Sequence, residues 1–261
     1  MVMIVEIKKE LLYPFLIFDK PIRYKENITF NPVKMKNIIE FQQSSLSITF
    51  PKDSIVTEKQ LIKMSYFDFI KYAHENKELA EKYDSPLLPY YWTWALSLIR
   101  LTLDENIELK YNQQNLSIFI NDEEISSEIF DDIRKIIILQ NDIDYDVDEF
   151  MNKDTIQALE KAREFEMKKR KEKSDIEDYI DSMVVGLKVT EEYISNLSIR
   201  KFWRYIKRLN KHEDYLACRS GEMSGMVTFK EPYSHWMSTI STDDKYENLK
   251  ADEGELRGKV G

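Results

Sequence analysis

Cysteine, glycine and histidine are scarce in this sequence of 261 residues, which contains one cysteine, six glycines and three histidines. The single thiol, Cys218, permits no disulfide within the chain and no metal cluster built from its thiolates alone. His74, His212 and His235 lie far apart and form no pair with the spacing of metal ligands. The sequence therefore predicts no catalytic residue set, no metal site and no cofactor, and we expect a protein that is not an enzyme.

Glycine-rich loops with a known chemistry are also lacking. The segment GEMSGM at residues 221–226 does not have the GxSxG spacing that holds a nucleophilic serine on a strained turn. It also lacks the lysine of a phosphate-binding loop. We therefore interpret Gly221 and Gly225 as residues that relax the backbone at the end of a helix, with Met223 and Met226 as adaptable apolar contacts.

The sequence has no long apolar run and no excess of positive charge. Its longest apolar stretch, residues 92–103, is too short to span a bilayer and contains Arg100. The N-terminus lacks the small-residue cleavage site of a secretory signal, so we expect no membrane association. A formal net charge of -9 disfavours nucleic acid as a partner, because phosphate binding needs a broad positive surface. Apolar residues make up 43% of the chain, which is enough for a core, and we expect a folded cytoplasmic protein.

The first half of the chain predicts an α+β domain over residues 1–140, with short strands and a β-hairpin. Proline-flanked pieces predict extended segments, and alternation of apolar and polar residues around the turn at 112–115 predicts the hairpin. Helices are predicted from a capping box at Thr57 and Gln60 through Tyr72, over 90–103, and from Ser126 or Ser127 to about residue 139. The predicted extended segments are 13–18, 28–30 and 46–50, and the hairpin strands are 107–111 and 116–120.

The second half predicts a charged linker and then a mainly α-helical bundle. Residues 141–173 are acid-rich and then mixed in charge, which is typical of a linker with a solvated helix. Alternating aspartates from Asp142 resemble the start of a calcium loop, but Val147 and Lys153 replace its glycine and its bidentate glutamate, which favours the linker. Ser174 with Glu177 predicts a capping box, Thr190 and Ser198 predict two more helix starts, and the last helix is expected to end near residue 211. We expect a helical domain over 174–241 and a mobile tail over 242–261.

The predicted helix from Ser198 is strongly amphipathic. One side carries apolar residues at helical spacing, namely Ile199, Phe202, Trp203, Ile206 and Leu209. The other side carries Arg200, Lys201, Arg204, Lys207, Arg208 and Lys211. Such a basic side is either solvated or paired with an acidic partner. Trp203 is expected to anchor a core, and Trp236 either joins a core or lies at an interface.

The segment LSIRKFWRYIKRL, followed by GEMSGM and HWM, resembles the tail assembly chaperones of tailed bacteriophages or prophages of Gram-positive hosts. The resemblance covers mainly residues 175–240 and carries no catalytic signature. It implies a non-enzymatic protein of the host cytoplasm that keeps the tape measure protein soluble and helps recruit tail tube subunits. The partners would then be the tape measure protein and the tail tube protein, and a homo-oligomer is left open.

Two other roles for a phage protein are compatible with the same surfaces. The chain is alternatively a structural component of the virion, in the tail or the connector, or a small phage protein that inhibits a host target. Virions would contain a structural component and lack a chaperone. In a virion component the acidic linker and the tail would become ordered against neighbouring subunits, whereas an inhibitor would use the same faces as the chaperone. For the chaperone we expect the partner contacts to come from Trp203, Arg204, Arg208, Met223, Met226 and Trp236.

Overall fold

The computed structural model describes residues 7–25, 28–52, 56–143, 145, 174–225, 228–229 and 232–240. These residues fall into two compact units, one within 1–201 and one within 202–261. This division differs from the domains expected from the sequence, whose limits near 140 and 174 stay a prediction. The expected tail lies outside the described residues, as does the expected linker apart from residues 141–143 and 145. Asn141 was expected to begin the linker but is the last residue of a helix, and only the first residues of the calcium-like run are described.

The protein has an α+β fold, as the sequence predicts. The helices of the first unit are α1 (Lys9–Ile17), α2 (Ile38–Thr49), α4 (Lys59–Lys63), α5 (Tyr66–Glu75), α6 (Glu78–Lys82), α7 (Tyr91–Thr102), α8 (Ser127–Asn141), α10 (Ile176–Leu187) and α11 (Glu191–Asn196), with the 3-10 turns η1 (Met35–Asn37) and η2 (Leu88–Tyr90). The strands are β1 (Ile22–Tyr24), β2 (Ile28–Phe30), β3 (Leu109–Asn112), β4 (Ser117–Ile120) and β5 (Glu123–Glu124). The unit boundary falls within the last helix, α12 (Ile199–Met223).

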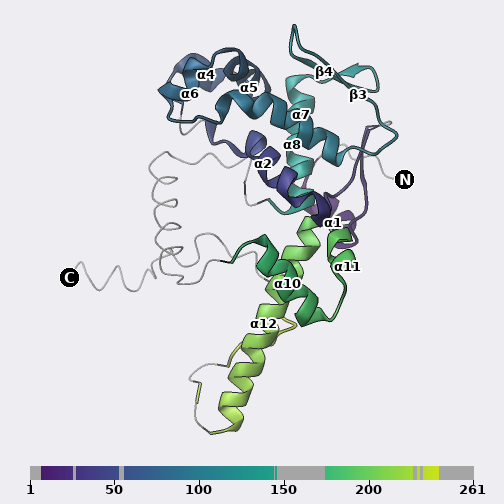
Figure 1. Cartoon of the computed structure of the whole chain (residues 1–261), viewed down its shortest axis with the longest axis vertical. Helices are drawn as coiled ribbons and strands as arrows, with labels where there is room; N and C mark the ends of the chain where they lie inside the picture. The colour runs from purple at the N-terminus through teal and green to yellow at the C-terminus, as the bar shows by residue number, and fades with distance from the viewer. Residues whose placement is uncertain are drawn as a thin grey trace, which may run out of the picture. The chain divides into compact units, whose positions relative to one another are not determined.

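The core of the first unit lies between α2, α5, α7 and α8. Helix α2 packs along α7, and α5 packs against both α7 and α8 (Figure 1). Aromatic rings fill these contacts, because Phe67 of α5 stacks on Phe130 of α8 at a centroid distance of 4.6 Å. Phe69 of α5 stacks on Phe50, which follows α2, at 5.9 Å. Large aromatic side chains therefore join three helices that are distant in sequence.

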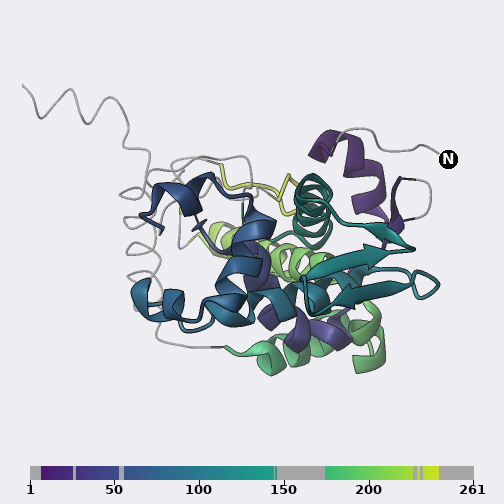
Figure 2. The ribbon, with the colours of Figure 1, turned by 90° about the horizontal axis from the view of Figure 1, so that it is seen from above.

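Two small antiparallel sheets accompany the helices. Strands β1 and β2 form a hairpin, and β3, β4 and β5 form a three-stranded sheet in that order. The register pairs Leu109 with Ile120, so the hairpin predicted at this place is confirmed, whereas β5 was not predicted. Ile118 and Ile120 of β4 are buried, while most of β3 is exposed. In Figure 2 the teal strands β3 and β4 extend away from the blue helices on one side of this unit.

Two segments predicted to be extended are helical instead, while the strand at 28–30 is confirmed. Residues 13–18 mostly belong to α1, where Leu12 and Leu16 are buried one helical turn apart. Residues 46–50 mostly belong to α2, whose buried face includes Ser44 and Ser47. Each of these hydroxyls donates to a carbonyl three residues earlier, at 3.4 and 2.6 Å, which satisfies a polar group on an otherwise apolar helix face. The alternating sequence LSITF therefore indicated a strand wrongly.

Several helix starts are confirmed and two are displaced. The side chains of Ser126, Thr190 and Ser198 accept hydrogen bonds from main-chain N–H groups three residues later, as expected of N-caps. The predicted helix from Thr57 to Tyr72 is two helices, because α4 ends at Lys63 and Ser65 then caps α5 by accepting from the N–H of Asp68. The capping box predicted at Thr57 and Gln60 is wrong, since α4 begins at Lys59 after Glu58, whose side chain makes no capping bond. The capping box predicted at Ser174 is formed one residue later by Asp175 and Asp178.

The segment 197–201 is joined to the beginning of the first unit by main-chain hydrogen bonds. The N–H of Met35 donates to the carbonyl of Leu197 at 2.9 Å, and the N–H of Ile199 donates to that of Val33 at 2.9 Å. Arg200 is buried and donates to the carbonyl of Leu16 at 2.9 Å, and Lys201 donates to the carbonyl of Ile17. These two cations cover the C-terminal carbonyls of α1, so the prediction that they lie on a basic face that is solvated or paired with an acidic partner is wrong for them.

Helix α12 is longer than expected. It was predicted to end near Lys211, but it continues to Met223 and includes Gly221 in its last turn. The break comes at Gly225, whose φ of +70° is a left-handed conformation that glycine adopts without strain. Among the described residues, no helix has the length and apolarity of a membrane span.

Candidate partner-binding site on helix α12

The second unit is built around α12 from Phe202 onward and the segment 232–240, which we call the strap. The chain turns at Ser224 and Gly225, and the strap lies against the side of the helix that it has just left (Figure 1, yellow). Helical spacing places Arg208, Lys211, His212 and Tyr215 on the helix face that the strap covers. This face is where the predicted partner-binding residues meet other parts of the chain.

Two cations of α12 hold the main chain of the strap. The guanidinium of Arg208 donates to the carbonyl of Trp236 and, at 2.9 Å, to the carbonyl of Ser238. The ammonium of Lys211 donates to the carbonyl of Thr239 at 3.0 Å. The helix therefore recognises carbonyl oxygens near one end of the strap, and this mode of contact does not depend on the side chains of the bound segment.

Aromatic rings make further contacts between α12 and the strap. Trp236 meets His212 edge to face, with ring centroids 5.0 Å apart. Tyr215 meets the rings of His235 and Tyr233 at 4.9 and 5.5 Å. The hydroxyl of Tyr233 donates to Glu222 at 3.0 Å, and partial desolvation together with this bond raises the pKa of Tyr233. Tyr233 therefore remains a neutral donor at physiological pH.

The charges of helix and strap are not matched. The strap, PYSHWMSTI, contains no aspartate or glutamate. Within the described part of the chain, Arg208 and Lys211 meet main-chain carbonyl oxygens of the strap. A hydrogen bond from a cation to a carboxylate is stronger than one to a neutral carbonyl. The helix face therefore has a capacity for anionic groups that the strap does not use.

A column of apolar residues runs along α12 beside the face that the strap covers. Its members repeat every seven residues and so lie on one side of the helix, namely Phe202, Leu209, Leu216 and Met223. Phe202 is fully buried, Leu209 is half-buried, Leu216 is 45% exposed and Met223 is 77% exposed. The exposure of this column thus rises toward the end of α12, where an apolar surface is available to another helix.

The structure brings together two of the six residues that the sequence singled out. Arg208 and Trp236 are in contact through the carbonyl of Trp236. Met223 is exposed at the end of the apolar column. Trp203 and Arg204 are half-buried, with the Trp203 ring edge to face on Phe202 at 5.2 Å, and Met226 lies outside the described residues.

Sequence reasoning missed the rest of the strap-covered face. His212, Tyr215 and Tyr233 take part because α12 continues past Lys211 and the chain then reverses. The spacing of residues 208, 211, 212 and 215 at i, i+3, i+4 and i+7 is the signal that identifies this face once the longer helix is known.

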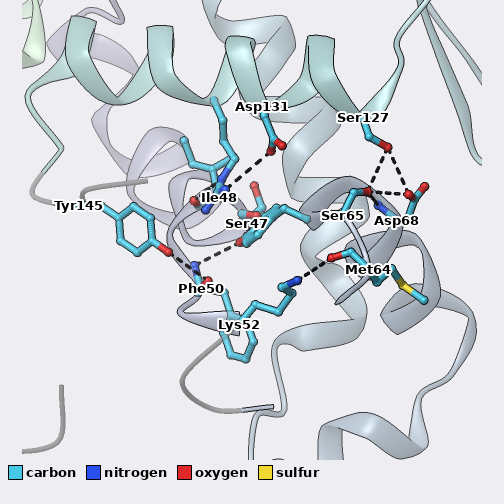
Figure 3. A network of polar contacts seen from close by, with 12 residues as sticks. Ser47, Ile48, Phe50, Lys52, Met64, Ser65, Asp68, Ser127, Asp131 and Tyr145 are labelled. Atoms are coloured by element: carbon cyan, nitrogen blue, oxygen red, sulfur yellow. Dashed lines mark hydrogen bonds and ion pairs between the residues drawn. The ribbon is translucent and has the colours of Figure 1, made fainter. Parts of the chain in front are cut away.

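A second polar cluster lies in the first unit, around two buried cations (Figure 3). Lys52 donates to the carbonyls of Ile62 and Met64 at 2.8 and 2.6 Å. Arg134 donates through Nε to the carbonyl of Ile48 at 2.8 Å, and its guanidinium lies 3.5 Å from the ring centroid of Tyr66. These cations cover carbonyls at the ends of α4 and α2, so we assign the cluster a role in stabilising the fold.

The carboxylates next to this cluster also have structural partners. Desolvation raises the pKa of Asp131, although Arg134 opposes this shift from 3.9 Å away. Ser65 and Ser127 both donate to Asp68, at 2.5 and 3.2 Å, and thereby join the starts of α5 and α8 (Figure 3). In the described ranges, no group of three or more histidine, cysteine, aspartate or glutamate side chains is arranged to hold a metal ion.

Comparison with known families points to the same part of the chain as the site. Residues 168–241 match the family model described as YomV second domain, which is a phage-type domain family. The matched range includes α10, α11, α12 and the strap, and it covers less than a third of the chain. No curated protein and no solved structure matches the chain. The family match therefore indicates a phage origin.

Proposed function

We propose that this protein is a non-enzymatic assembly factor of a phage tail, which acts in the host cytoplasm as a chaperone for the tape measure protein and recruits tail tube subunits. The observation that carries the proposal is the exposed end of the apolar column on α12, within the region that matches a phage-type family. An aggregation-prone helical partner would cover Leu216 and Met223 with its own apolar face. Methionine is suited to this role because its flexible side chain adapts to different partner surfaces.

Co-expression tests the proposal directly. A tape measure protein from the same phage would be produced with and without this chain, and the soluble fraction would be measured after centrifugation. We expect the tape measure protein to remain soluble only when the chain is present. Equal solubility in both cases would remove the support for a chaperone.

The variant Met223→Asp makes the same experiment specific to the proposed surface. A carboxylate at this exposed position should not disturb folding, but it would oppose burial against an apolar helix. Lys207→Gln, at an exposed position of the same helix, serves as the matched control. We expect Met223→Asp to reduce the soluble tape measure protein and Lys207→Gln to leave it unchanged.

Purified virions distinguish the main alternative. A chaperone is absent from the mature particle, whereas a tail or connector protein is present in a fixed number of copies. Detection of the chain in virions at the level of known structural proteins would replace the chaperone with a virion component.

A further inference from the structure

We infer that the face of α12 under the strap is a binding site for an acidic, aromatic segment of a partner protein, and that the strap occupies this site until the partner displaces it. The inference rests on the proposed function, since it identifies the chemistry of a partner that an assembly factor would bind. It adds a second surface, defined by cations and rings, to the apolar column.

The contacts between α12 and the strap define which kind of segment the site accepts. Arg208 and Lys211 hold carbonyl oxygens at positions 236, 238 and 239, so they lie along an extended segment of three to four residues. His212 receives the ring of Trp236, which lies at the start of that segment. The site therefore accepts an aromatic side chain followed, two or three residues later, by groups that accept hydrogen bonds from cations.

The two cations of the site meet no negative charge on the strap. The strap supplies the aromatic rings but no carboxylate, so the two cations bind only neutral oxygens of the strap. A partner segment with aspartate or glutamate at the positions that correspond to Ser238 and Thr239 would provide charge-assisted bonds. It would therefore bind the face more tightly than the strap does at equal effective concentration.

The strap covers α12 with little burial of its own residues. Its contacts with α12 lie on one side of the helix within the described part of the chain, and each of its residues is exposed or half-buried. Gly225, at the end of the turn that follows α12, has a φ of +70°, which glycine adopts without strain. A weakly held segment of the same chain is suited to cover a site and then leave it.

Peptide binding to the full-length chain tests the inference. The probes are two fluorescein-labelled peptides, one with the strap sequence PYSHWMSTI and one that carries Ser238→Asp and Thr239→Glu. Fluorescence anisotropy would be measured with the native chain and with Trp236→Ala, which weakens the strap of the chain itself. We expect the acidic peptide to bind roughly fivefold or more tightly than the strap peptide, a preference that 1 M salt removes. We also expect Trp236→Ala to bind both peptides more tightly than the native chain.

Two matched variants locate the preference. The double variant Arg208→Gln with Lys211→Gln should bind the two peptides equally, because both cations have lost their charge. The control Lys207→Gln removes one charge from an exposed position and should keep the full preference. Circular dichroism of each variant confirms that α12 is retained.

Three results would overturn the inference. Equal binding of both peptides to the native chain would show that the face takes the strap of a second copy without selecting acidic groups. An absence of binding to both the native chain and Trp236→Ala would show that the strap is a fixed part of the unit. A preference that survives in the double variant would place it elsewhere on the chain. Each of these results leaves the solubility of the tape measure protein as a separate measurement, so the chaperone proposal stands or falls independently.

Discussion

Arg134 is a buried cation that contacts a main-chain carbonyl, two aromatic rings and the carboxylate of Asp131. Its side chain is 4% exposed, its Nε donates to Ile48, and its guanidinium lies over the ring of Tyr66. Tyr66 in turn donates to the carbonyl of Ser47 at 2.9 Å. One residue of α8 therefore fixes both the end of α2 and the start of α5.

Replacing Arg134 with methionine should destabilise the protein. The carbonyl of Ile48 would be buried without its donor, and the cation–π contact with Tyr66 would be lost, at a combined cost of about 2–4 kcal/mol. Urea denaturation followed by circular dichroism measures this change. Arg100→Met, at an exposed position of α7, is the control and should alter the free energy of unfolding by less than about 0.5 kcal/mol. Equal effects of the two substitutions would contradict the structural role of Arg134.

Asp131 makes stability depend on pH in a defined direction. Burial raises its pKa in the folded protein above the unfolded value of 3.8, so the folded state favours the protonated carboxyl. Its contribution to stability is therefore complete below about pH 3.8 and is lost as the pH rises through the folded pKa. Asp131→Asn removes this loss. We expect the melting temperature of the variant, relative to the native chain, to increase between pH 3 and pH 7.

The control for this experiment is Asp181→Asn, at an exposed position of α10. Its melting temperature relative to the native chain should stay constant over the same range. If Asp131→Asn also showed no change with pH, the balance at this site would be set by Arg134, Lys135 and Lys52, whose charges lower the pKa of Asp131.

At the scale of elements, the sequence predicts best where local signals and burial agree. Helix α7 was expected over 90–103 and spans Tyr91–Thr102, because its apolar spacing is clear and prolines precede it. Helix α8 begins after the predicted cap Ser126, and the β3–β4 hairpin has the predicted alternation. In these elements the pattern of apolar residues matches the period of the structure that forms.

The errors arise where tertiary contacts decide the structure. Helix α1 contains Pro14, and a proline at this place indicated an extended segment. Burial of Leu12 and Leu16 favours the helix instead. The basic side of α12 was expected to be solvated or to meet an acidic partner, but Arg200 and Lys201 donate hydrogen bonds to carbonyls of α1. These partners are more than 180 residues apart in sequence, and no local pattern identifies them.

The site was predicted in part for the same reason. Arg208 was predicted from the basic side of the amphipathic helix, and Trp236 from its place after the last expected helix, where little core is left for it to join. The two residues contact each other because the strap lies back along α12. This contact could not be predicted, because the helix was expected to end near Lys211 and continues to Met223. The length of α12 thus determines which of the predicted residues lie close together.

The start of α10 provides a test at the scale of a single element. Asp175 accepts from the N–H of Asp178, and Asp178 accepts from that of Asp175, both at 3.0 Å. Asp175→Ala removes half of this capping box and should cost about 1 kcal/mol of stability. Ser174→Ala changes the residue that the sequence favoured as the cap and should have almost no effect. Thermal unfolding of both variants compares them, and a larger effect of Ser174→Ala would restore the sequence-based assignment.

At the scale of the whole molecule, the two units differ in how much apolar surface they bury. Of the described buried apolar side chains, only Phe202 and Ile206 belong to the second unit. The last three turns of α12 have Leu216 and Met223 exposed and are covered on one face by the strap. Most helical stability in proteins comes from tertiary packing, so these turns have little support from a core.

Hydrogen exchange should therefore divide α12 along its length. Amide protons of residues 213–223 should exchange at least about 100-fold faster than those of α8, because local opening there exposes little apolar surface. Mass spectrometry of peptides from α8 and α12, after deuterium labelling at neutral pH, measures both rates in one sample. Addition of the acidic peptide should slow exchange at residues 208–215, whereas the double variant Arg208→Gln with Lys211→Gln should show no such change. Protection of residues 213–223 equal to that of α8, without any ligand, would mean that the second unit is as stable as the first and that its strap is not poised for release.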